Sequence, residues 1–309
     1  MKKIATMRKP LFTSAFVLLT MILFGAEQKP QPDIRNLKYG QAERNVMDIW
    51  LAKSAQPAPL VIFVHGGGFV AGDKSAINGA TLNEFLKNGI TVAAINYRYR
   101  TGEPDGVMAC LSDVKYALQY LRYNAAKYNI DKSRVAMMGS SAGAGSSLWI
   151  AFHDDMADPQ ATDPVLREST RIQAAVAISP QATYDLLQWP ALYGMEESSP
   201  YLAKDDNALN LYGIKSLDEL DTPAGKQKRA ELDMLGMMTP DDPPFMAVSD
   251  KTAEIPPISR GQFLHHPIHV KALREKAERV GVECVAIAPA YGYTSSVTVT
   301  GFIIEKLNR

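Results

Sequence analysis

The chain has 309 residues, of which 46% are hydrophobic, so it is long enough for one large domain with a full apolar core. Its formal net charge is zero, and no basic cluster persists beyond the first ten residues. This balance excludes an electrostatic case for binding nucleic acid or an anionic surface.

The N-terminal segment has the pattern of a secretory signal peptide. Basic side chains within the first ten residues precede an apolar stretch over residues 11–24, and the small residues Gly25 and Ala26 follow. An apolar stretch of about 14 residues is short for a membrane span. We therefore expect residues 1–26 to be removed on export to the periplasm or the exterior, leaving no stable membrane span. An uncleaved anchor is the alternative.

The rest of the chain alternates between two kinds of element. Residues 27–38 are predicted to be a linker, and residues 39–309 one domain. Such alternation predicts a mostly parallel sheet covered by helices on both faces. The predicted strands are 46–51, 60–64, 91–97, 135–138, 172–179, 244–248 and 283–289, and the predicted helices are 76–87, 107–128, 266–280, 297–307 and one after residue 143.

One segment, at about residues 184–243, interrupts this alternation. It contains helical fragments, prolines and no predicted strand, and its aromatic and methionine side chains are spread throughout. These side chains either line a pocket over the site or form the segment's own core.

A candidate nucleophile lies in the sequence Gly139-Ser140-Ser141-Ala142-Gly143, which fits the pattern G-x-S-x-G. An apolar strand precedes it and a helical pattern follows, the context in which this motif exposes a serine on a strained turn. The two glycines avoid Cβ atoms where the strand and the helix crowd together. A plain strand-to-helix loop is the alternative for this motif on its own.

A second motif ends the predicted strand at residues 60–64. It reads His65-Gly66-Gly67-Gly68-Phe69, and its glycines allow backbone N–H groups to converge on one point. The tetrahedral intermediate of ester hydrolysis needs such donors for its oxyanion. We therefore predict an oxyanion hole formed by the N–H groups of Gly67, Gly68 and Ala142.

With these two motifs the chain resembles the α/β-hydrolase family, in particular its hormone-sensitive-lipase-like and bacterial feruloyl-esterase-like carboxylesterase branches. The resemblance is close over residues 65–145 and looser after about residue 181. It implies a doubly wound, mostly parallel sheet of about eight strands with a helical cap insertion, here residues 184–243. It also implies a serine nucleophile, small acyl or aryl ester substrates, and neither a metal nor an organic cofactor.

The sequence departs from the family pattern where the other two triad members are expected. The family places an Asp or Glu after the strand that follows the cap, and a His after the last strand. Here Tyr293 occupies the His position, and two alignments put Gln262 or Thr252 at the acid position. Asp250 and Glu254 lie close by, and Asp250 is the candidate acid.

The choice of base is limited by a count of five histidines. His65 belongs to the glycine motif, where its family role is structural, and His153 is predicted to point away from the site. His265 and His266 fall on the loop after the acid position, and either is a candidate base. The alternative is that His266 and Pro267 merely begin a helix at its surface.

The two cysteines, Cys110 and Cys284, lie in apolar contexts. Burial as small hydrophobic side chains is the simpler interpretation, and a disulfide in an oxidising compartment is the alternative.

Three functional hypotheses remain open. The first is a serine carboxylesterase-like hydrolase acting on a small-molecule ester through Ser141. The second is a catalytically degraded relative that binds a ligand under its cap, supported by the missing His and Asp. The third, a serine peptidase of the same fold, is weakened because the chain lacks the large N-terminal domain typical of that branch.

Overall fold

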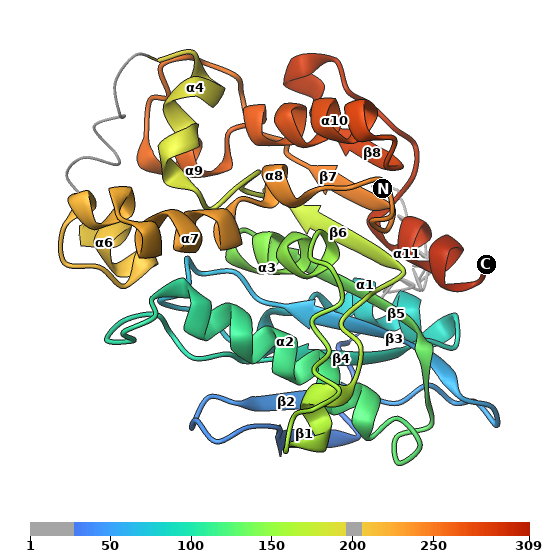
Figure 1. The fold of residues 1–309 in the computed structure, drawn as a ribbon. Coiled ribbons are helices and arrows are strands. Elements are labelled where there is room, and N and C mark those ends of the chain that lie inside the picture. The colour runs from blue at the N-terminus through green and yellow to red at the C-terminus, as the bar shows by residue number, and fades with distance from the viewer. Residues whose placement is uncertain (1–27, 196–205) are drawn as a thin grey trace, which may run out of the picture.

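The computed structural model describes residues 28–195 and 206–309. Its centre is one eight-stranded sheet with the strand order β1-β2-β4-β3-β5-β6-β7-β8 (Figure 1). The strands are β1 Ile34–Lys38, β2 Val46–Trp50, β3 Ala58–Val64, β4 Thr91–Ile95, β5 Ile130–Ser140, β6 Ala174–Ile178, β7 Phe245–Val248 and β8 Cys284–Ile287.

The strands β4 to β8 run parallel with β3, whereas β1 and β2 pair antiparallel at one edge. All seven residues of β3 are buried, as expected for a central strand whose two faces are both covered. The predicted mostly parallel sheet of about eight strands is confirmed.

Helices cover both faces of the sheet. The helices are α1 Gly79–Lys87, α2 Val107–Tyr123, α3 Ala142–Ala151, α4 Trp189–Tyr193, α6 Asp206–Tyr212, α7 Pro223–Leu232, α8 Met234–Met237, α9 Arg260–His265, α10 Ile268–Val280 and α11 Val299–Leu307. Short 3-10 turns lie at Lys74–Ala76, Pro164–Arg167, Leu186–Gln188, Leu217–Asp221 and Pro289–Tyr291. Apolar side chains of α1 and α11 pack on one face, and those of α2, α3 and α10 pack on the other.

Several sequence predictions need correction at their boundaries, and one helix was not predicted. The expected linker 27–38 ends in the edge strand β1, which pairs with β2 through Ile34, Leu37 and Lys38. Its sequence, Ile-Arg-Asn-Leu-Lys, has its two apolar residues three positions apart, so it lacks the alternation that indicates a strand. The helix predicted over 107–128 ends at Tyr123, and α9 was not predicted at all, because six residues show less than two turns of periodicity.

The segment between β6 and β7 carries α4, α6, α7 and α8 (Figure 1). Within its described residues this segment forms helices and 3-10 turns and no strand. The predicted signal peptide, residues 1–26, lies outside the described residues and stays a prediction. In the described part of the chain, no helix is both long enough and apolar enough to cross a membrane.

Candidate active site

Ser141 lies on the sharp turn between β5 and α3. Its backbone has φ 53° and ψ −118°, a conformation that costs a non-glycine residue about 1–3 kcal/mol. A Cβ on Gly143 would lie 2.0 Å from the carbonyl oxygen of Val64, and one on Gly139 would lie 2.4 Å from the backbone of Gly143. The predicted crowding at the two motif glycines is thus observed, and it forces Ser141 out of the strand.

The glycine loop follows β3, the strand next to β5 in the sheet. Gly67 and Gly68 have φ values of +113° and +60°, and a Cβ on Gly67 would lie 2.1 Å from the carbonyl oxygen of Ala71. Among the backbone hydrogen bonds of the described loops, none uses the N–H of Gly67 or Gly68 as donor. Ala142 is the first residue of α3, so its N–H has no partner one turn earlier in the helix.

His265 is the histidine that the structure brings to Ser141. Its Nε2 lies 2.8 Å from the Oγ of Ser141, although the two residues are 124 positions apart in the chain. His265 is the last residue of α9, which follows the loop after β7. This distance is right for transfer of the hydroxyl proton to the imidazole.

The surroundings of His265 favour its neutral form. Burial lowers the pKa of His265, whereas a backbone hydrogen bond with Gly261 acts in the opposite direction. Gly261 is one helical turn earlier, and His153 makes the same type of contact through Nδ1 with the carbonyl of Trp149, at 2.7 Å. Because Nε2 faces Ser141, Nδ1 is the nitrogen that donates to Gly261, and Nε2 is left to accept from Ser141.

His266 and Asp250, the other candidate base and the candidate acid, lie away from the contact between Ser141 and His265. His266 is fully buried, and its Nδ1 accepts the N–H of Ile268 at 3.0 Å, so it supports the start of α10. The carboxylate of Asp250 is 81% exposed and pairs with Lys251 at 3.2 Å. The hydrogen bonds and ion pairs of the described residues join no carboxylate to the imidazole of His265.

The positions that the family pattern assigns to the acid and the His have structural partners here. Gln262 donates to Thr252 at 3.0 Å and contacts Glu254. Tyr293 pairs with Ala288 through backbone hydrogen bonds, and its ring lies under the guanidinium of Arg274 at 4.2 Å. Neither Gln262 nor Tyr293 lines the cavity around Ser141.

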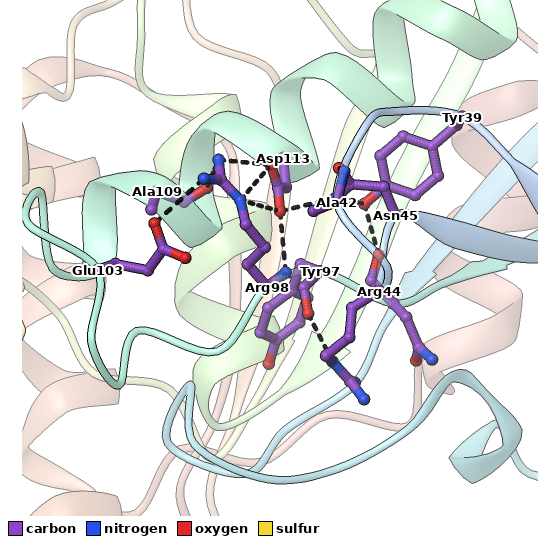
Figure 2. Close-up of polar contacts among 10 residues, drawn as sticks. Tyr39, Ala42, Arg44, Asn45, Tyr97, Arg98, Glu103, Ala109 and Asp113 are labelled. Atoms are coloured by element: carbon purple, nitrogen blue, oxygen red, sulfur yellow. Dashed lines mark hydrogen bonds and ion pairs between the residues drawn. The ribbon is translucent and has the colours of Figure 1, made fainter.

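A polar network joins the segment between β1 and β2 to α2 and to the residues after β4 (Figure 2). Asp113 on α2 accepts from Asn45 at 2.8 Å and pairs with Arg98 at 2.9 Å. The neighbouring Arg44 donates to the carbonyls of Tyr97, at 2.9 Å, and Gly72, at 3.0 Å. Through Arg44, the network therefore ties the segment between β1 and β2 to Gly72, three residues after the glycine motif at residues 65–69.

His65 lies at the start of that loop and has a structural environment. Its ring stacks on Tyr97 with 4.3 Å between centroids, and its Nδ1 contacts the carbonyl of Gly66 at 2.7 Å. Burial lowers the pKa of His65. Its stacking and its hydrogen bond keep the ring at the back of the loop, in agreement with the structural role that the resemblance implies.

A cavity of about 720 Å³ opens over Ser141 and His265. Apolar side chains at the ends of β3, β5 and β6 line one part of the cavity, and the segment between β6 and β7 contributes the others. The apolar lining includes Phe63, Met138, Ile178, Tyr184, Trp189 and Leu211. Tyr184 also packs against α3, where a Cβ on Gly145 would lie 1.9 Å from its hydroxyl oxygen.

Two remaining sequence predictions concern metals and disulfides. Over residues 28–195 and 206–309, no group of three or more His, Cys, Asp or Glu side chains is arranged to hold a metal ion. Cys110 and Cys284 are both free; Cys110 is buried and Cys284 is partly buried. The interpretation of both as small hydrophobic side chains agrees with their positions in the apolar core.

The sheet order, the strained serine and the facing glycine loop define an α/β-hydrolase. A family model, BD-FAE, matches residues 47–266, which is more than half of the chain. The chain belongs to this family of α/β-hydrolase esterases.

Curated relatives carry esterase names. The chain is 32% identical over 130 residues to esterase LipC of Mycobacterium tuberculosis, covering 41% of this chain and 31% of LipC. It is 31% identical over 113 residues to an isoprenylcysteine alpha-carbonyl methylesterase of Arabidopsis thaliana, covering 36% of this chain and 25% of that protein. The chain thus spans a third or less of the length of these two relatives.

Solved structures share the fold. A truncated carbohydrate esterase from gut microbiota matches with a TM-score of 0.67 and 19% identity, over 89% of this chain and 96% of that one. A propionate-bound esterase of Thermogutta terrifontis matches with a TM-score of 0.58 and 17% identity, over 84% and 83% of the two chains. These similarities support the α/β-hydrolase fold.

Proposed function

We propose that this protein is a serine carboxylesterase that hydrolyses small acyl or aryl esters. The observation that carries the proposal is the 2.8 Å contact between the Oγ of Ser141 and the Nε2 of His265, next to the glycine loop. A serine is a weak nucleophile unless a base lies within hydrogen-bonding distance. The esterase names of the relatives give independent support.

In the first half of the reaction, the Oγ of Ser141 attacks the ester carbonyl while its proton passes to Nε2 of His265. The N–H groups of Gly67, Gly68 and Ala142 donate to the oxyanion, where preorganised donors contribute several kcal/mol. The tetrahedral intermediate then collapses, the bond to the alcohol breaks, and the departing alkoxide takes the proton from His265. An acyl group remains on Ser141.

In the second half, a water molecule gives its proton to His265 and attacks the acyl carbonyl. The same three N–H groups bind the new oxyanion. Collapse of this intermediate breaks the bond to Oγ, which recovers its proton from His265, and the acid leaves. No redox step or external cofactor enters this balance.

The cavity supports the choice of substrate. Its predominantly apolar lining suits an uncharged acyl or aryl group, and a cavity of 720 Å³ has the size of typical small-molecule sites. Mixed assays with esters of short, medium and aromatic acids would measure the preference through kcat/KM.

Two experiments test the proposal. A serine-reactive phosphonate is expected to label the wild type at Ser141, identified by peptide mass spectrometry, and to leave Ser141→Ala unlabelled. Loss of Ser141 should also reduce ester hydrolysis at least about a hundredfold, because nucleophile and base act as a unit. A wild type that neither hydrolyses esters nor reacts with the phosphonate would favour the ligand-binding hypothesis instead. Turnover of a peptide panel, with no turnover of esters, would favour the peptidase.

Export is a separate part of the proposal. It is supported by the basic residues and the apolar stretch over residues 11–24. Mature protein from the native host is expected to begin near Glu27, as N-terminal sequencing would show. A soluble cytoplasmic protein with an intact Met1 would contradict export.

A further inference from the structure

The short helix α9, which carries His265, cannot satisfy its own C-terminal carbonyls. It has six residues, and the last four carbonyl groups of any α-helix lack partners within it. In this helix three successive carbonyls accept hydrogen bonds from side chains elsewhere in the molecule. Tyr193 Oη donates to Phe263, Gln181 Nε2 donates to Leu264 at 2.8 Å, and Ser249 Oγ donates to His265 at 3.1 Å.

These three donors come from three separate elements. Gln181 follows β6, Ser249 follows β7, and Tyr193 ends α4 in the segment between those strands. All three are buried, with exposed fractions of 6%, 1% and 3%. Burial raises the pKa of Tyr193, so its hydroxyl keeps its proton and remains a donor.

Aromatic side chains of α4 also pack on α9, which lies beside α4 (Figure 1). The ring of Tyr193 stacks on Phe263 with 5.0 Å between centroids, and the ring of Trp189 lies 5.1 Å from Phe263. The buried His269 on α10 accepts the N–H of Ala182 at 3.3 Å. The backbone of α9 is therefore held at several points close to His265.

We infer that Tyr193 and Ser249 are positioning residues for His265, with Gln181 as a third contact. This inference rests on the proposed function. In a Ser-His-Asp triad, a carboxylate holds the imidazole in its tautomer and orientation. Here the bond with Gly261 selects the tautomer, and the contacts of Tyr193 and Ser249 with the carbonyls of Phe263 and His265 hold the orientation. Neither Tyr193 nor Ser249 lines the cavity, so neither touches the substrate.

The test uses Tyr193→Phe, Ser249→Ala and the double variant in the full-length protein. Gln181 is left unchanged because it lines the cavity. The matched control is Tyr212→Phe. Tyr212 is equally buried in the same segment. Its hydroxyl accepts the N–H of Leu186 at 2.7 Å and donates to the carbonyl of Tyr184 at 3.1 Å, and its hydrogen bonds within the described residues involve no residue of α9.

Each single change is expected to lower kcat about tenfold and the double about a hundredfold, since a displacement of about 1 Å costs on that order. KM for a short ester should stay within about twofold, because the cavity lining is intact. The acidic limb of the kcat/KM profile should move to higher pH, because a loosened His265 becomes more exposed and the burial that lowers its pKa weakens. Tyr212→Phe should show none of these changes.

Three outcomes are distinguishable. If the wild type is active and Ser141→Ala and His265→Asn are inactive, but Tyr193→Phe and Ser249→Ala keep wild-type kcat and pH profile, the positioning inference is wrong and the esterase proposal stands. A fall of equal size in Tyr212→Phe would also overturn it, since that points to general loosening of the segment. If Tyr193→Phe does not fold, Ser249→Ala alone decides. A wild type without activity refutes the proposed function itself.

Discussion

The two halves of the candidate site are held in different ways. The glycine loop leaves the centre of the sheet directly after the fully buried β3, and Arg44, part of a polar network (Figure 2), donates to Gly72 three residues beyond the loop. The proposed base, His265, lies instead on a six-residue helix between β7 and α10, held by side chains from several elements. Local backbone geometry therefore fixes the first half, and contacts between distant residues fix the second.

The largest expected effect separates the two adjacent histidines of the second half. His265→Asn should lower kcat/KM at least about a thousandfold, because the base is lost. His266→Asn should stay within about tenfold, since an asparagine oxygen can still accept the N–H of Ile268. Kinetics on a short ester would compare the two variants. If only His266→Asn lost activity, the base would have been misassigned.

The next prediction probes the first half of the site through its backbone. Gly67→Ala should abolish activity or folding, because its Cβ would lie 2.1 Å from a backbone oxygen. Gly68→Ala has open space and should only incur a strain of about 1 kcal/mol from its positive φ. Gly89→Ala, which also has positive φ and open space, is the control for strain away from the site. Chemical denaturation and kcat would be measured for all three.

Equal losses of kcat in Gly67→Ala and Gly89→Ala, after correction for the folded fraction, would contradict a special role for the loop.

These two predictions show what the sequence could reveal. The elbow at Ser141 and the glycine loop were predictable because glycine spacing reports the local backbone directly, and the parallel sheet followed from alternating elements. The choice between His265 and His266 was not predictable. His265 ends α9, whereas His266 has already left the helix, and which of the two meets Ser141 depends on how α9 packs. The contacts of Tyr193 and Ser249 with α9 join residues 70 and 16 positions apart, and no local pattern announces them.

Acid should weaken the second half, which holds three histidines whose pKa burial lowers, more than the first, which holds one such histidine, His65. Burial lowers the pKa of His269 to about 3, and burial also lowers the pKa of His265 and His266. Because each pKa is lower in the folded state than in the unfolded chain, the unfolded state takes up more protons as the pH falls through about 6.5, and stability present above that pH is lost. His269 alone should lower the free energy of unfolding by about 2 kcal/mol as the pH falls from 6.5 to 5.

Urea denaturation at pH 7, 6 and 5 would measure this loss. Asp73, whose pKa is lowered to about 2, changes the free energy of unfolding only at more acidic pH. His269→Asn keeps an acceptor for the N–H of Ala182 and should show a shallower pH dependence than the wild type. An unchanged slope in that variant would assign the acid sensitivity to other groups.

The smallest expected effect concerns the family's usual His position. Tyr293→His should change kcat less than about twofold, because residue 293 does not line the cavity and His265 already contacts Ser141. Adding Gln262→Asp should not raise kcat above the wild type either. A clear gain in the double variant would instead show that a base after β8 can still reach Ser141, and that the two base positions are interchangeable.

The turn after β8 has a wider consequence for recognising enzymes in this family. It keeps its two backbone hydrogen bonds between Ala288 and Tyr293 and its ring contact with Arg274, although it offers no imidazole. A survey that counts a chain as inactive whenever this turn lacks a histidine would discard the protein. Proton transfer requires an imidazole at one point in space, and more than one stretch of a chain can deliver it there.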